Sequence, residues 1–156
     1  MKLAQALIER ADLQRKLAQL GARLQQNAQY QEGEAPAEDP QDLLTDYRRS
    51  AAALTRLIVA INRTNHNVTL ADGTTMLAAL AERDRLKAEH AMLGKVADAA
   101  MADQSRYSRS EIRTLAAVDI RALRREADNV AKRCRELDIQ IQQANWENDI
   151  AEEEAG

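Results

Sequence analysis

The feature that most constrains this chain is a repeat of apolar residues between residues 120 and 144. They recur at alternating intervals of three and four: Ile120, Leu123, Ala127, Val130, Cys134, Leu137, Ile141 and Ala144. Because an α-helix turns once every ~3.6 residues, this spacing lines the apolar side chains up along one face. Such a seam is typical of a helix that packs lengthwise against another helix. It predicts a helix over about 119–147.

Three more long helices are predicted upstream of this one. The first covers about 2–28, with a leucine seam at Leu13, Leu17, Leu20 and Leu24. The second covers about 40–66, because Asp39 suits the N-cap and Pro40 suits the first helical position. The third covers about 75–102 and has a weaker, alanine-padded face, with His90 near it. Its seam consists of Leu77, Leu80, Leu86, Leu93, Val96 and Met101.

The fold class expected is all-α, with four long amphipathic helices. Five glycines and two prolines leave little material for turns, and the absence of Phe leaves Leu, Ile, Val and Ala to fill the core. We expect an up-down-up-down bundle of two antiparallel hairpins in one domain, residues 1–148, followed by an acidic, frayed tail at 149–156. Short extended segments are expected near 68–70 and 112–118; for 112–118 an early helical turn is the alternative.

The connectors between the helices carry opposite charges. From Glu32 to Asp46 the chain has six acidic residues and no basic one, whereas Gln104 to Arg125 has six arginines against Glu111 and Asp119. In an up-down-up-down bundle these connectors lie at the same end. We therefore expect them to face each other, within one chain or across a dimer.

Composition narrows the cellular setting. The net charge of −3 provides no general attraction to nucleic acid or anionic lipid, so no nucleic-acid partner is expected, and membrane binding is left open. The single cysteine, Cys134, fits a reducing compartment. The first sixteen residues do not resemble a secretory signal, and the most apolar window, residues 50–62, is too short to span a bilayer and contains Arg56. A cytoplasmic protein is expected.

Catalytic and metal-binding patterns are weak in this sequence. A ferritin-like di-metal site needs two Glu-x-x-His pairs, but the residues three before His66 and His90 are Arg63 and Lys87. Cys134 lies in the apolar seam, where a buried, unreactive thiol is expected. We therefore expect no enzymatic activity, catalytic residue, metal site or cofactor.

One cluster could contact an anion or a partner. Arg106, Arg109 and Arg113 lie close together in the sequence, and Tyr107 could stack on a base. The alternative is that these arginines pair with the acidic connector of the same protein.

Several segments resemble the septicolysin-like family of small bacterial helical proteins. They are MKLAQALIERADLQRKLAQL at 1–20, QEGEAPAEDP at 31–40, INRTN at 61–65, LADGTTM at 70–76, DQSRYSRSEI at 103–112 and IQQANW at 141–146. The chain departs from the family at Ala78 and after Trp146. The resemblance implies that Arg106, Tyr107, Arg109 and Trp146 belong to shared features, and the family's name implies a pore-forming cytolysin.

The leading hypothesis is a non-enzymatic structural or interaction protein that acts as a homo-oligomer through its apolar helix seams. One alternative is a membrane-active cytolysin. Another is an anion- or nucleic-acid-binding module that uses the Arg-rich connector 104–125.

Overall fold

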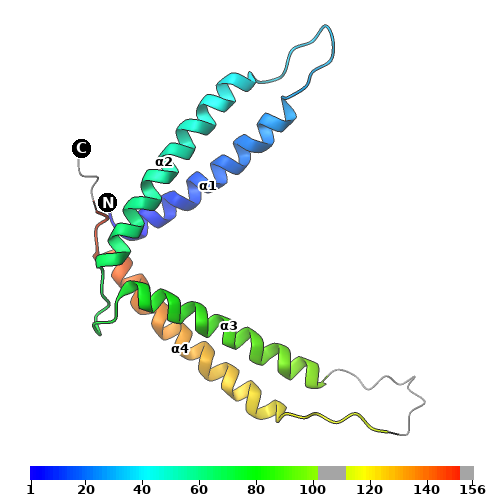
Figure 1. The fold of residues 1–156 in the computed structure, drawn as a ribbon, viewed down its shortest axis with the longest axis vertical. Helices are drawn as coiled ribbons and strands as arrows, with labels where there is room; N and C mark the ends of the chain where they lie inside the picture. The colour runs from blue at the N-terminus through cyan, green and yellow to red at the C-terminus, as the bar shows by residue number, and fades with distance from the viewer. Residues whose placement is uncertain (102–111, 152–156) are drawn as a thin grey trace. The chain divides into compact units, whose positions relative to one another are not determined.

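The chain is all-α, as the sequence predicts. The computed structural model describes residues 1–101 and 112–151 and contains four helices there (Figure 1). Their bounds are α1 Leu3–Gln26, α2 Pro40–Asn67, α3 Met76–Met101 and α4 Ile120–Glu147. Each predicted boundary lies within two residues of the observed one. The prediction of four long helices is confirmed.

The chain divides into two compact units, each built on an antiparallel helical hairpin. The first contains Met1–Val68 together with Gln143–Gly156, and the second contains Thr69–Gln142. In the first unit α1 lies beside α2, and in the second α3 lies beside α4 (Figure 1). The two predicted hairpins are therefore confirmed, while a single domain over residues 1–148 stays a prediction.

Local hydrogen bonds hold the connector of the first hairpin where α1 ends and where α2 begins. Asp39 is the N-cap of α2, and its Oδ1 accepts a hydrogen bond of 2.8 Å from the N–H of Gln41. At the end of α1, the side chain of Asn27 donates to the carbonyl of Arg23 at 2.8 Å and accepts from the N–H of Glu38 at 2.9 Å. These bonds satisfy backbone groups that have no partner inside the helices.

The core of the first unit lies near the start of α1. Leu3, Ala6, Leu57 and Ile61 are all buried there, and the partly buried Leu7, Leu13 and Ile150 pack against them. Ile150 follows α4, so the chain beyond the last helix contributes to this core.

The hairpin of α3 and α4 is marked by ion pairs between its helices. Near the start of α3, Arg83 lies 3.1 Å from Asp138 of α4, and near the end of α3, Asp98 lies 2.6 Å from Arg124. This pairing of early with late residues is what an antiparallel hairpin requires. Between them, Leu86, Ala97, Ala127 and Val130 are buried.

The seam predicted for α3 is partly wrong. Leu86 is buried, but Leu77, Val96 and Met101 are 49%, 36% and 62% exposed. Leu77 lies nine residues before Leu86, or about two and a half turns, so the two side chains point to opposite faces of the helix. His90, expected near the seam, is exposed.

The segments between the helices follow their expected chemistry. Thr69 and Thr75 form an isolated antiparallel bridge around a tight turn, where Gly73 has φ 85°. Only glycine adopts such a positive φ without strain. Residues 112–118 are irregular rather than helical, and Asp119 caps α4 by accepting a 3.0 Å hydrogen bond from the N–H of Ala122.

Candidate interaction surfaces

The Arg-rich cluster predicted from sequence is only partly described. Arg106, Tyr107 and Arg109 lie outside the described residues. Arg113 is exposed and makes no ion pair within residues 1–101 and 112–151. The structure therefore does not test whether the four side chains come together.

Some charges of the two connectors find partners within their own hairpin. Glu38 of the acidic connector pairs with Arg23 of α1, and the Nε–Oε2 distance is 2.9 Å. Their mutual hydrogen bond lowers the pKa of Glu38 and raises that of Arg23. Arg124, from the Arg-rich segment, pairs with Asp98 of α3. The two connectors belong to different units, so their predicted contact stays a prediction.

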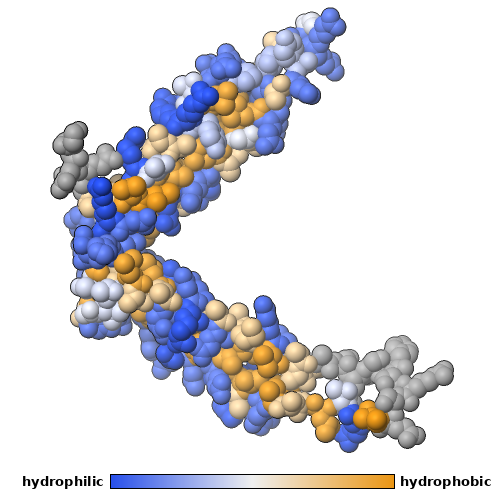
Figure 2. Space-filling model, in the orientation of Figure 1, coloured by the Kyte–Doolittle hydropathy of each residue, from blue (hydrophilic) through white to orange (hydrophobic). Residues whose placement is uncertain are grey.

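The hairpin of α1 and α2 leaves its apolar stripes half covered. Apolar side chains gather along both hairpins (Figure 2). Several leucine and isoleucine side chains of the first hairpin are only partly buried: Leu7, Leu13, Leu17, Leu24, Leu44, Leu54 and Ile58. A stripe on a core-facing helix is about 100° wide, and one neighbouring helix covers only part of it. These half-buried side chains are available to a further helix.

The outer face of α3 is also apolar. Leu77 and Met92 are 49% and 58% exposed, and Ala81, Ala88 and Ala99 are exposed on the same face. Because consecutive helical residues are about 100° apart, these five positions fall within roughly 60° of one another. That face lies opposite the buried Ala79, Leu86 and Ala97. Several of the alanines of α3 therefore belong to a second apolar face, opposite the buried one.

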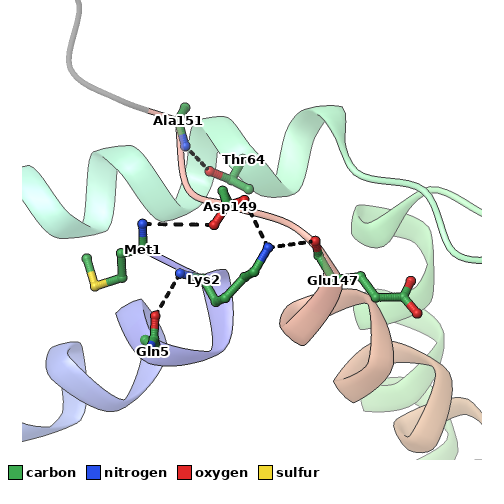
Figure 3. Close-up of polar contacts among 7 residues, drawn as sticks. All are labelled: Met1, Lys2, Gln5, Thr64, Glu147, Asp149 and Ala151. Atoms are coloured by element: carbon green, nitrogen blue, oxygen red, sulfur yellow. Dashed lines mark hydrogen bonds and ion pairs between the residues drawn. The ribbon is translucent and has the colours of Figure 1, made fainter.

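The residues after α4 are joined to the start of α1, which the sequence did not predict (Figure 3). Nζ of Lys2 donates to Oδ2 of Asp149 at 2.9 Å and to the carbonyl of Glu147 at 3.2 Å. The N–H of Ala151 donates to Oγ1 of Thr64 in α2 at 2.8 Å. The frayed tail predicted from residue 149 is therefore wrong for residues 149–151, which are held by hydrogen bonds and by the packing of Ile150.

This junction has a defined pH dependence. The hydrogen bond from Lys2, together with its positive charge, lowers the pKa of Asp149. A carboxyl whose pKa is lower in the folded state stabilises that state above its ordinary pKa of about 3.9, and the contribution disappears as the pH falls through the folded value.

We expect Asp149→Asn to speed hydrogen exchange at the N–H groups of Ile150 and Ala151 at neutral pH. The difference from the unchanged protein should shrink as the pH falls through the lowered pKa of Asp149, where the carboxyl itself becomes protonated. Asp128→Asn on α4 is the matched control, because Asp128 is exposed and makes no ion pair within the described residues. Equal exchange in all three proteins at neutral pH would contradict the role of Asp149.

A pocket of about 340 Å³ shares residues with this junction. Leu57, Ala60 and Ile150 give it an apolar floor, and Glu9 and Arg56 are charged residues of its wall. Glu9 and Arg56 are exposed and form no ion pair within the described residues. The volume and the mixed lining suit a small amphipathic molecule. The sequence alone does not predict this pocket, because the pocket forms only when Ile150 packs beside α2. The one sequence feature that indicates such packing is an isoleucine within an otherwise acidic tail.

The described residues were compared with what a metal site or a reactive thiol requires. Within residues 1–101 and 112–151, no three His, Cys, Asp or Glu side chains lie close enough together to hold a metal ion. Cys134 is a free, half-buried thiol in the seam of α4. None of the described helices is long and apolar enough to span a bilayer.

The chain is similar to a solved structure and matches a family profile, and both are described as of unknown function. A crystal structure of a functionally unknown conserved protein from Corynebacterium diphtheriae matches with a TM-score of 0.90 and 38% sequence identity, over 97% of this chain and 99% of that chain. No curated protein sequence matches. The profile of the family of unknown function DUF6847 matches residues 10–150.

This match corrects the resemblance to the septicolysin-like family, which is wrong. The shared short segments did not identify the family, and the pore-forming activity implied by that name has no further basis. Since the profile covers most of the sequence, the chain belongs to the family of unknown function DUF6847.

Proposed function

We propose that this protein is a non-enzymatic interaction protein that acts as a homo-oligomer. The observation that carries the proposal is the half-covered apolar stripe of the hairpin of α1 and α2. Each helix of a hairpin has one lengthwise neighbour, which covers only part of its apolar stripe. The stripe residues Leu17, Leu54 and Ile58 therefore remain only half buried. A second copy would supply the missing helices and complete a four-helix arrangement.

The electrostatics of the described residues support a role without catalysis. The shifted pKa values belong to ion pairs and turns at the surface. Glu82, for example, has a lowered pKa because Arg85 donates hydrogen bonds to it, and Asp72 has a lowered pKa because it accepts a hydrogen bond from the N–H of Thr74. Catalytic groups are usually perturbed by burial in a cleft. The single cysteine supports a place in the cytoplasm.

Self-association can be tested through thermal unfolding at different protein concentrations. A folded homodimer gains about 2.7 kcal/mol over its unfolded chains for a hundredfold rise in concentration, so its Tm should rise. Leu54→Gln should reduce this dependence, whereas Thr55→Gln, on the exposed side of α2, should leave it unchanged. A Tm that does not change with concentration would exclude the proposal.

A second candidate function is anion binding by the Arg-rich connector. Arg113, Arg121 and Arg125 are exposed and have no ion pair among the described residues, which favours an external anionic partner. Heparin binding that weakens steeply with salt would support this function, and Arg113→Glu with Arg121→Glu should weaken it. The matched control is Arg48→Glu with Arg63→Glu, which changes two exposed arginines of α2 in the same way. Equal binding by the two double variants would rule this candidate out.

A further inference from the structure

The outer face of α3 combines apolar residues with unpaired charges. Its apolar positions follow intervals of four and seven, at Leu77, Ala81, Ala88, Met92 and Ala99. The large exposed side chains of Leu77 and Met92 are separated by alanines that allow another helix to come close. The face runs for about 33 Å at ~1.5 Å per residue, so it is long enough for a lengthwise helix contact.

Two charges of opposite sign lie on one edge of this face. Asp84 and Lys95 are eleven residues apart, which is about three turns, so they share that edge and are separated by about 16 Å. Both are exposed, and neither makes an ion pair within the described residues. On the other edge, Arg85 is already paired within α3, at 2.8 Å from Glu82 and 2.7 Å from Glu89. The unpaired Asp84 and Lys95 are therefore free to recognise a partner.

The placement of these charges is complementary to itself. If a second α3 lies antiparallel, with the two-fold axis midway between Asp84 and Lys95, each aspartate faces the lysine of the other copy. The axis then passes between Ala88 and Ala91, where small side chains permit a close approach. A parallel, in-register pair would instead place both aspartates at one level and both lysines at another, so like charges would repel.

We propose that α3 binds the α3 of a second copy of this chain, antiparallel and about a two-fold axis. Leu77 and Met92 are buried in this contact, and two symmetric Asp84–Lys95 pairs set its direction. The inference rests on the proposed function, since it specifies one surface through which the chain self-associates. It also explains why α3 has apolar residues on two opposite faces.

Reversed charges test this contact. In Asp84→Lys, as in Lys95→Asp, two attractive pairs become two repulsive ones, so each variant alone should self-associate about tenfold more weakly. When the two variants are mixed, each reversed charge meets an opposite charge, and a mixed dimer should form with the affinity of the unchanged protein. The control mixture, Asp128→Lys with Lys16→Asp, carries the same net charges on surfaces away from the outer face of α3.

The affinities can be measured by analytical ultracentrifugation, with one variant of each mixture carrying a fluorescent label. Preferential mixed dimers of the α3 variants, and no such preference in the control mixture, are the expected result. If the unchanged protein self-associates but the α3 variants behave like the controls, the α3 contact is overturned and the proposed function stands. If the unchanged protein does not self-associate at all, both fail.

Discussion

Ile61→Ala should lower the free energy of unfolding by about 2–5 kcal/mol, because it removes a buried side chain from the core of the first unit. Ile61 is 1% exposed and packs with Leu3, Ala6 and Leu57. Since natural proteins are stable by only about 5–15 kcal/mol, this is a large share of the total. Urea unfolding followed by circular dichroism, at one fixed protein concentration, measures the change.

The matched control is Val59→Ala, two residues away on the same helix. Val59 is 44% exposed, so its truncation should change the free energy of unfolding by no more than about 0.5 kcal/mol. A loss below about 1 kcal/mol in Ile61→Ala would mean that the core of this hairpin does not lie where the structure places it.

The second large effect is expected on self-association. Leu77→Lys combined with Met92→Lys should weaken the contact between the α3 helices of two copies at least about a hundredfold, because four lysines would enter an apolar helix contact. Both side chains are about half exposed and lie opposite the buried face of α3, so the double variant should unfold at nearly the same urea concentration as the unchanged chain when both are monomeric.

The control for this variant is Ile8→Lys combined with Ile139→Lys. These isoleucines are 56% and 67% exposed on α1 and α4, so the control introduces the same charges elsewhere. Association constants of the two double variants, measured by ultracentrifugation, show whether lysines on the outer face of α3 weaken self-association more than lysines on α1 and α4. Equal weakening in both double variants would show a general effect of charge rather than a contact at α3.

The helices could be predicted well because their ends are determined by local chemistry. Asp39 with Pro40 and Asp119 mark helix starts through hydrogen bonds to residues two or three positions away, and the structure shows both caps. The 3-4 repeat of α4 was similarly informative, with Val130 and Ile141 buried as expected. Such features need no knowledge of the tertiary structure.

The surfaces were harder to predict because they depend on long-range packing. Its apolar side chain alone predicts Leu77 in the seam of α3, whereas its position around the helix relative to Leu86 places it on the outer face. The bond between Lys2 and Asp149 joins residues 147 positions apart, and no local pattern indicates it. The family was also misidentified, because short shared segments carry less information than a match over residues 10–150.

Self-association is the central claim, and its most direct test is the mass of the native protein by light scattering coupled to size exclusion. We predict a species of at least twice the 17.4 kDa of one chain at micromolar concentrations. A single species of 17.4 kDa across that range would contradict the account.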